Sequence, residues 1–96
     1  MNLLVCYDVN TLTPDGRKRL RRVASACKDF GQRVQWSVFE CRVSETQLER
    51  LRQRLLAIVH PQEDSLRLYF LGSDRARCVE AHGRDHYVDF TAPLVV

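Results

Sequence analysis

The sequence lacks several features that mark common classes of protein. No apolar run approaches the roughly 18 residues that a membrane-spanning helix needs, and no basic region precedes the first apolar stretch, as it would in a signal peptide. We therefore expect a cytoplasmic protein with no membrane partner. The four glycines are scattered, so there is no glycine-rich phosphate loop. The nucleophile-elbow and Cys/His signatures of hydrolases are also missing.

Cysteine is sparse and widely spaced. The four cysteines are Cys6, Cys27, Cys41 and Cys78, and none forms a CxxC pair of the kind that holds zinc. Cys6 and Cys27 fall on apolar faces of the expected elements, where cysteine behaves as a small hydrophobic residue. We expect reduced structural thiols.

The chain has 96 residues, of which 45% are hydrophobic and 28% are charged. These values are typical of one soluble globular domain. A core of this size is modest, so an oligomer would add stability. The net charge of +3 is mild, but five of the six residues from Arg17 to Arg22 are cationic. This cluster is either a solvated helix face or a stripe that binds phosphates.

Two amphipathic helices are predicted. Thr13 and the following proline begin the first helix, which should reach about Phe30 and stop at Gly31. Its cationic residues lie away from its apolar face. The second helix begins after Ser44, where Gln47 three residues later completes a capping box, and it ends before the His-Pro pair near residue 60.

Strands are predicted on either side of these helices. Residues 2–9 form a nearly continuous apolar run, which indicates a central strand buried on both faces. Residues 33–43 are strand-like, but their alternation changes phase near Trp36. A bulged strand or two short strands with a tight turn at Trp36 and Ser37 would explain this change. Residues 65–72 alternate clearly.

Helices packed on one face of a mainly antiparallel sheet define an α+β class. If residues 33–43 are two strands, residues 1–71 follow the ferredoxin-like βαββαβ plan. Residues 72–96 are then a C-terminal extension. Within it, ARCVEA at 76–81, YVDF at 87–90 and PLVV at 93–96 are candidate strands.

Asp8 ends the first strand and is the best candidate for chemistry. A carboxylate there is either a solvated strand end or a metal ligand on a rigid platform. Mg²⁺ or Mn²⁺ takes oxygen ligands and often only one or two protein carboxylates. A twofold dimer would place a second Asp8 opposite the first. A metal held there could activate water to attack a phosphodiester.

A second cluster of metal-ligand types lies in the extension. Its members are Cys78, Glu80, His82, Asp85, His86 and Asp89. The spacing CxxxHxxxH could bind a transition metal. It matches no common zinc module, however, and Gly83 argues against a helix that presents both imidazoles, so a polar surface loop is the alternative.

Four motifs taken together resemble one family. They are YDV at the end of the first strand, TPDGRKRLRRVA at the start of the first helix, GQRVQWSVFEC after it, and LYFLG at the end of the plan. The chain is similar to the CRISPR-associated protein two family over nearly its whole length, and to its subtype I-C-like branch. RVQWSVFEC is the most specific of these matches.

The resemblance implies a ferredoxin-like homodimer of single-domain chains, residues 1–96. It implies a short hairpin at Trp36, and an extension, residues 72–96, that pairs with the partner protomer. It also implies a Mg²⁺-dependent endonuclease, with Mn²⁺ as a possible substitute, acting on RNA or double-stranded DNA. In this family the dimer takes part in spacer acquisition together with the CRISPR integrase.

Carried over residue by residue, the resemblance implies roles for seven positions. Asp8 matches the catalytic, metal-binding acid. The residues that match contacts to the nucleic-acid backbone are Arg17, Arg19 and Arg33. The residues that match supporting positions are Tyr7, Ser37 and Phe39.

Two rival functions share this architecture. One is a non-catalytic adaptor that holds duplex DNA and bridges integrase dimers, in which the arginines matter and Asp8 does not. The other is a ferredoxin-like regulatory module that binds a small ligand.

Overall fold

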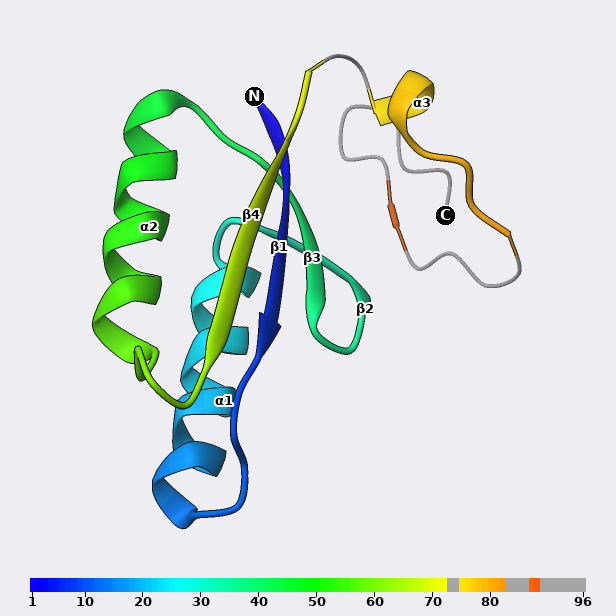
Figure 1. The fold of residues 1–96 in the computed structure, drawn as a ribbon. Coiled ribbons are helices and arrows are strands. Elements are labelled where there is room, and N and C mark those ends of the chain that lie inside the picture. Colours follow the sequence, from blue (N-terminus) through cyan, green and yellow to red (C-terminus); the bar gives the residue numbers. More distant parts are fainter. Residues whose placement is uncertain (73–74, 83–86, 89–96) are drawn as a thin grey trace.

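A computed structural model describes residues 1–72, 75–82 and 87–88. Within these ranges, four strands form one sheet, and two long helices cover one of its faces (Figure 1). The elements are β1 (Asn2–Asp8), α1 (Pro14–Lys28), β2 (Gly31–Gln35), β3 (Val38–Arg42), α2 (Glu45–Ile58), β4 (Ser65–Leu71) and α3 (Arg75–Cys78). The order βαββαβ over the first 71 residues confirms the α+β, ferredoxin-like plan.

The sheet has the strand order β2-β3-β1-β4, with antiparallel pairs throughout. β1 is central, as predicted, and β4 and β2 are the edges. A two-residue turn at Trp36 and Ser37 joins β2 to β3, and the register shifts between Arg33 and Gln35. The turn confirms the predicted hairpin, and the shift explains the change of phase in the sequence.

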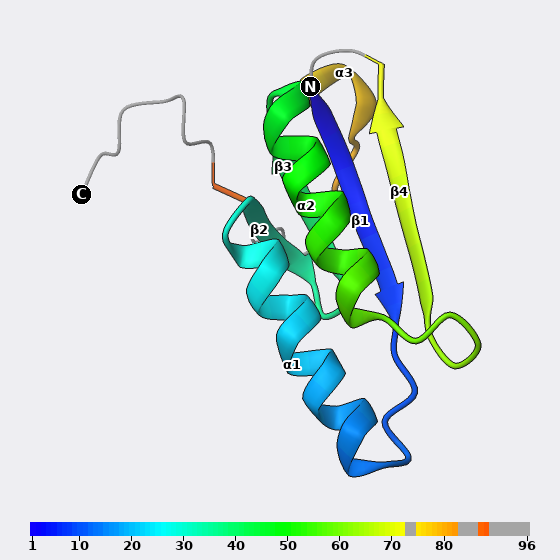
Figure 2. The same ribbon diagram turned by 90° about the vertical axis from the view of Figure 1, so that its left-hand side faces the viewer.

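The core lies between the sheet and the helices, which run side by side over one face (Figure 2). Its largest fully buried side chains are Phe39, Leu3, Leu51, Leu55, Val5, Val23 and Cys27. Each large apolar side chain buried in this way contributes about 1.5–3 kcal/mol. Because these residues come from β1, β3, α1 and α2, the core holds β1 against both helices.

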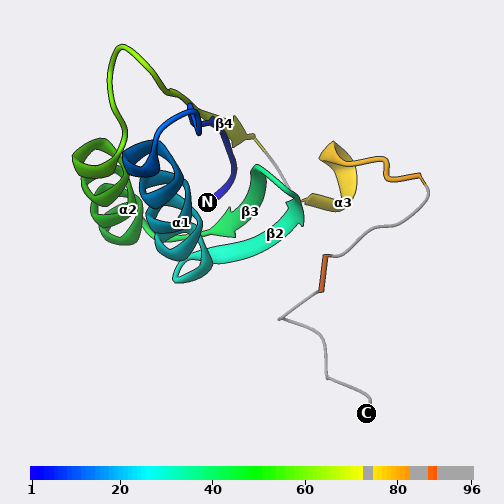
Figure 3. The ribbon, with the colours of Figure 1, turned by 90° about the horizontal axis from the view of Figure 1, so that it is seen from below.

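The prediction that β1 is buried on both faces is wrong for the face away from the helices, which we term the open face. There Leu4 and Cys6 are half-buried and Asp8 is exposed. An antiparallel sheet with both helices on one side leaves its other side uncovered. α3 lies on the side of the open face (Figure 3).

Local sequence signals set the helix ends. The Thr13 hydroxyl caps α1 and the Ser44–Gln47 capping box begins α2, both as predicted. α1 ends at Lys28, slightly before the predicted Phe30. Gly31 then opens β2, where a Cβ atom would run into the backbone of β3.

The extension differs from its prediction. The strand predicted for ARCVEA is wrong, because Arg75–Cys78 forms a short helix; arginine and alanine favour helices, and a run this short carries no reliable period. The predicted PLVV strand lies outside the described residues, as does half of YVDF. The backbone amide of Val88 donates to the side-chain oxygen of Gln32 at 2.6 Å, and the backbone carbonyl of Val88 accepts from the side-chain nitrogen of Gln32. Within the described ranges, no helix is long and apolar enough to cross a membrane.

Candidate metal and nucleic-acid site

Asp8 is the last residue of β1 and faces away from the core. β1 pairs with β4 so that Asp8 lies opposite Ser65. The alternation of the strand places Asp8 on the open face with Leu4 and Cys6, while Val5 and Tyr7 point into the core. Among the described residues, the side chain of Asp8 has no hydrogen-bond or ion-pair partner, and the residue is exposed. Its oxygens are therefore open to an external ligand.

The donor set around Asp8 fits a hydrated ion better than a fully caged one. No group of three metal-ligand side chains occurs in the part of the chain that the structure describes. One exposed carboxylate suffices for an ion such as Mg²⁺ that retains several waters. A second copy of the chain in a twofold dimer would supply a further carboxylate, because like residues lie opposite one another near the axis.

The turn between β2 and β3 is fastened to the end of β1. The Tyr7 amide donates to the Ser37 carbonyl at 3.1 Å, and the Tyr7 hydroxyl donates to the Trp36 carbonyl at 3.4 Å. Tyr7 is 5% exposed, and its ring stacks on Phe39 with 6.2 Å between centroids. Tyr7, Ser37 and Phe39 thus position the backbone around Asp8 from inside the molecule.

Arg33 lies among aromatic rings. Its guanidinium carbon is 5.2 Å from the centroid of Phe39 and 5.9 Å from that of Trp36. Its Nε atom is buried and has no hydrogen-bond partner in the part of the chain that the structure describes. Burial raises the pKa of the Tyr7 hydroxyl, and the nearby Arg33 guanidinium offsets part of that rise. Arg33 therefore braces the turn.

Arg19 points toward the loop before β4. Its Nε donates to Asp64 at 2.9 Å, and its terminal nitrogen donates to Glu63 at 3.2 Å and to Asp64 at 3.3 Å. The Asp64 side chain is fully buried, and that of Arg19 is only 15% exposed. This geometry favours a structural role for Arg19 over the predicted contact with a nucleic-acid backbone.

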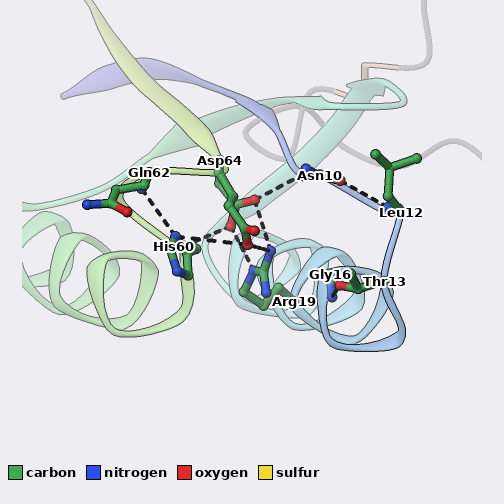
Figure 4. Close-up of polar contacts among 9 residues, drawn as sticks. Asn10, Leu12, Thr13, Gly16, Arg19, His60, Gln62 and Asp64 are labelled. Atoms are coloured by element: carbon green, nitrogen blue, oxygen red, sulfur yellow. Dashed lines mark hydrogen bonds and ion pairs between the residues drawn. The ribbon is translucent and has the colours of Figure 1, made fainter.

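Asp64 joins three segments: the loop after β1, the helix α1 and the loop between α2 and β4 (Figure 4). We call the residues Asp64, Arg19, Asn10 and His60 the Asp64 junction. The Asp64 carboxylate accepts from the amides of Asn10 at 3.0 Å and His60 at 2.7 Å, as well as from Arg19. Burial would raise the pKa of Asp64, but these bonds outweigh it and the pKa is lowered. The junction fixes the chain just beyond Asp8, because Asn10 lies two residues further on.

Gly16 lets the same loop rest on the first turn of α1. A Cβ atom at this position would run into the carbonyl oxygen of Asn10. The Asn10 side chain also accepts from the Leu12 amide at 3.0 Å, so the loop from Asp8 to α1 is held at both ends.

The remaining first-helix cations are exposed. Arg17 donates to the Thr11 carbonyl at 3.2 Å, and its side chain stays at the surface. The exposed cations of α1 are Arg17, Lys18, Arg21, Arg22 and Lys28. They form a positive surface on α1 of the kind that contacts phosphates.

Sequence reasoning missed Arg67. The register of β4 places it opposite Cys6, hence on the open face with Asp8. Its guanidinium donates to the Tyr69 hydroxyl at 3.0 Å. The alternation of β4, in which Leu66 and Leu68 face the core, already carried this information.

The second cluster finds no support in the described residues. His82 and Glu80 lie 2.9 Å apart, and both side chains are largely exposed. Asp85, His86 and Asp89 lie outside the described residues, so the cluster as a whole stays a prediction.

A cavity of about 370 Å³ lies at the opposite end of β1 from Asp8. Asn2 and Leu3 line it, together with Gly31 and Gln32 from β2 and Tyr87 from the extension. Such a cavity is what the small-ligand alternative would use, and it shares no lining residue with the surroundings of Asp8.

Comparison with known proteins shows the family of the chain. A model of the CRISPR associated protein Cas2 family matches residues 1–78. The chain belongs to the Cas2 family. The family assignment confirms the resemblance inferred from the four motifs, while membership of a subtype I-C-like branch stays a prediction.

Several relatives match over their full length. CRISPR-associated endoribonuclease Cas2 1 of Moorella thermoacetica is 51% identical over 96 residues, which is all of both chains. CRISPR-associated endonuclease Cas2 of Halalkalibacterium halodurans is 46% identical over 95 residues, 99% of each chain. A crystal structure of Streptococcus pyogenes Cas2 superposes with a TM-score of 0.77 at 53% identity, covering 86% of this chain and all of that one.

Proposed function

We propose that the protein is a Mg²⁺-dependent endonuclease of a CRISPR system, in which Asp8 holds the metal. The observation that carries the proposal is the exposed carboxylate at the end of the central strand, on the open face and without a partner among the described residues. Relatives named as endoribonuclease and endonuclease support it.

The active unit is a homodimer. The open face presents the half-buried apolar side chains of Leu4, Val38 and Leu71 and the 45% exposed ring of Tyr69, a surface that a second copy would cover. An isologous interface there places like residues opposite one another near the axis. Two Asp8 carboxylates would then face one ion. When bound, Mg²⁺ neutralises phosphate charge and activates water for hydrolysis of the phosphodiester.

The substrate is RNA or DNA, held mainly through its phosphates. The exposed cations of α1, Arg17 and Arg21 among them, provide contacts that are sensitive to salt and indifferent to sequence. Arg67 adds a cation on the same face as Asp8. A chain of this kind also suits spacer acquisition together with the CRISPR integrase.

A non-catalytic adaptor is the second candidate, and the positive surface of α1 favours it, since that surface would hold duplex DNA without any chemistry. The two functions separate by mutation. Reversing the charge of Arg17 and Arg21 should weaken duplex binding and lower its salt dependence by about one per lost phosphate contact. Asp8→Asn should leave duplex binding unchanged.

The test is cleavage of labelled RNA and DNA over a Mg²⁺ titration, with Asp8→Asn as the variant. Asp15→Asn is the matched control, because Asp15 is an exposed acid in the first turn of α1. We expect Asp8→Asn to lose at least about 100-fold in rate and Asp15→Asn to lose little. A folded Asp8→Asn protein that cleaves at the wild-type rate would refute the proposal.

A further inference from the structure

Trp36 is an exposed tryptophan that the fold does not explain. It is 86% exposed, whereas tryptophan is highly buried on average. It occupies the two-residue turn between β2 and β3, where asparagine and glycine are the residues that turn geometry favours. Neither burial nor turn chemistry therefore accounts for an indole at this position.

Trp36 lies beside the proposed metal ligand. The Tyr7 amide donates to the Ser37 carbonyl at 3.1 Å. Asp8 is the residue after Tyr7, and Trp36 is the residue before Ser37. The antiparallel register thus brings the backbones of Asp8 and Trp36 together at one end of the sheet. Figure 1 shows this turn next to the end of β1.

The surroundings of Trp36 hold the turn in place and leave the ring open. The Tyr7 hydroxyl bonds to its carbonyl at 3.4 Å. The Arg33 guanidinium lies over the ring at 5.9 Å and is itself braced by Phe39 at 5.2 Å. An indole that is 86% exposed keeps most of its surface free for another flat group.

We propose that Trp36 stacks on an unpaired base of single-stranded nucleic acid whose backbone passes Asp8. Aromatic side chains bind unpaired bases in this way with little regard to sequence. In a duplex the base faces are already stacked on one another, so this contact selects single strands. The inference rests on the proposed function and adds to it a residue that distinguishes single strands from duplexes.

The chain offers a direct probe, because Trp36 is its sole tryptophan. Fluorescence of the full-length protein is titrated in EDTA, so that binding is measured without cleavage. The three ligands are a mixed-sequence single strand, the same strand in a duplex, and an abasic strand of equal length. We expect strong quenching by the single strand and little by the duplex or the abasic strand.

Variants measured by anisotropy of the labelled strands complete the test. Trp36→Leu should weaken single-strand binding about 10-fold and leave duplex binding nearly unchanged, while Trp36→Phe should retain most of the affinity. Leu56→Ala is the matched control, since Leu56 is an exposed apolar residue on α2, 62% exposed. It should bind like the wild type.

Three outcomes would overturn the inference. One is absence of quenching, and another is an equal loss of affinity for the abasic strand in Trp36→Leu. The third outcome combines two results: Trp36 fluorescence changes with protein concentration in the absence of nucleic acid, and Trp36→Leu has an altered oligomeric state. Together these results would show that Trp36 is a contact between two copies of the chain. Because binding is read in EDTA, failure of Asp8→Asn to stop cleavage is a separate result and leaves the Trp36 readout intact.

Discussion

Removing the Asp64 carboxylate should be among the most damaging single changes in the described part of the chain. Asp64→Ala would leave the amides of Asn10 and His60 without their acceptor and Arg19 without its closest partner. These groups hold the loop that follows Asp8, the first helix and the α2–β4 loop together. Losing them should loosen the base of the proposed site as well as the fold.

The magnitude follows from the contacts. Asp64 accepts four hydrogen bonds, at 2.7, 2.9, 3.0 and 3.3 Å, and each charge-assisted bond is worth about 1.5–3 kcal/mol. Such contributions do not add, and breaking a buried ion pair from one side costs about 3–5 kcal/mol in all. We expect a loss of that size, against a total stability of about 5–15 kcal/mol for a domain.

Urea unfolding followed by circular dichroism measures the loss, at one protein concentration because a dimer's stability depends on it. Glu63→Ala is the control, since Glu63 also pairs with Arg19 but is 44% exposed, and it should cost less than about 1 kcal/mol. If Asp64→Ala lowers the free energy of unfolding no more than Glu63→Ala does, the stabilising role of the Asp64 junction is refuted.

The pH dependence provides an independent check. The pKa of Asp64 is lower in the folded than in the unfolded state. Its stabilisation is therefore complete above the unfolded pKa of about 4 and disappears as the pH falls through the folded value. Wild type and Asp64→Ala should differ most near neutral pH, and their stabilities should converge in acid. A difference that is constant from neutral pH into acid would contradict this linkage.

Two further predictions concern packing and thiol chemistry. Gly16→Ala should destabilise the protein, although alanine normally stabilises a helix by about 1 kcal/mol, because its Cβ would run into the Asn10 carbonyl. Gly72→Ala, with open space around its Cβ, should change the unfolding free energy by less than about 0.5 kcal/mol, and equal effects of the two changes would refute the packing argument. With dithionitrobenzoate at pH 8, exposed Cys78 should react first, whereas burial raises the pKa of Cys27 to about 12 and should keep it unreactive until unfolding. Cys78→Ser should remove the fast phase, and a fast phase that survives would contradict this order.

Much of the fold follows from local patterns. The 3.6-residue period of α1 and α2, the capping box at Ser44 and the alternation of β4 are visible in the sequence. The phase change near Trp36 left two readings open, and the structure contains both a turn and a register shift. Each of these features depends on residues close together in the chain, which is why they were predictable.

The role of Arg19 was not predictable in this way. Arg19 and Asp64 are 45 residues apart, and the segment before β4 reads as an ordinary polar loop. Only the folded chain brings the guanidinium to the carboxylate. From the sequence, Arg19 and Arg17 are equivalent members of one cationic run, yet the fold buries the first and exposes the second.

The partial exposure of β1 has a similar origin. Its apolar run indicates burial on both faces, but the helices of one chain cover a single face. Leu4 and Cys6 carry the apolar character that a second copy would bury. The sequence predicts Asp8 as an acid at the end of a strand. How Asp8 would lie relative to Asp8 of a second protomer does not follow from the sequence of one chain.

The most direct test of the central claim is the number of Mn²⁺ ions bound per chain, measured by electron paramagnetic resonance in the absence of nucleic acid. If two Asp8 carboxylates share an ion, we expect one Mn²⁺ per two chains and none at this site in Asp8→Asn, with Asp15→Asn unchanged. One ion per chain, or an undiminished Mn²⁺ count in a folded Asp8→Asn protein, would contradict the shared site.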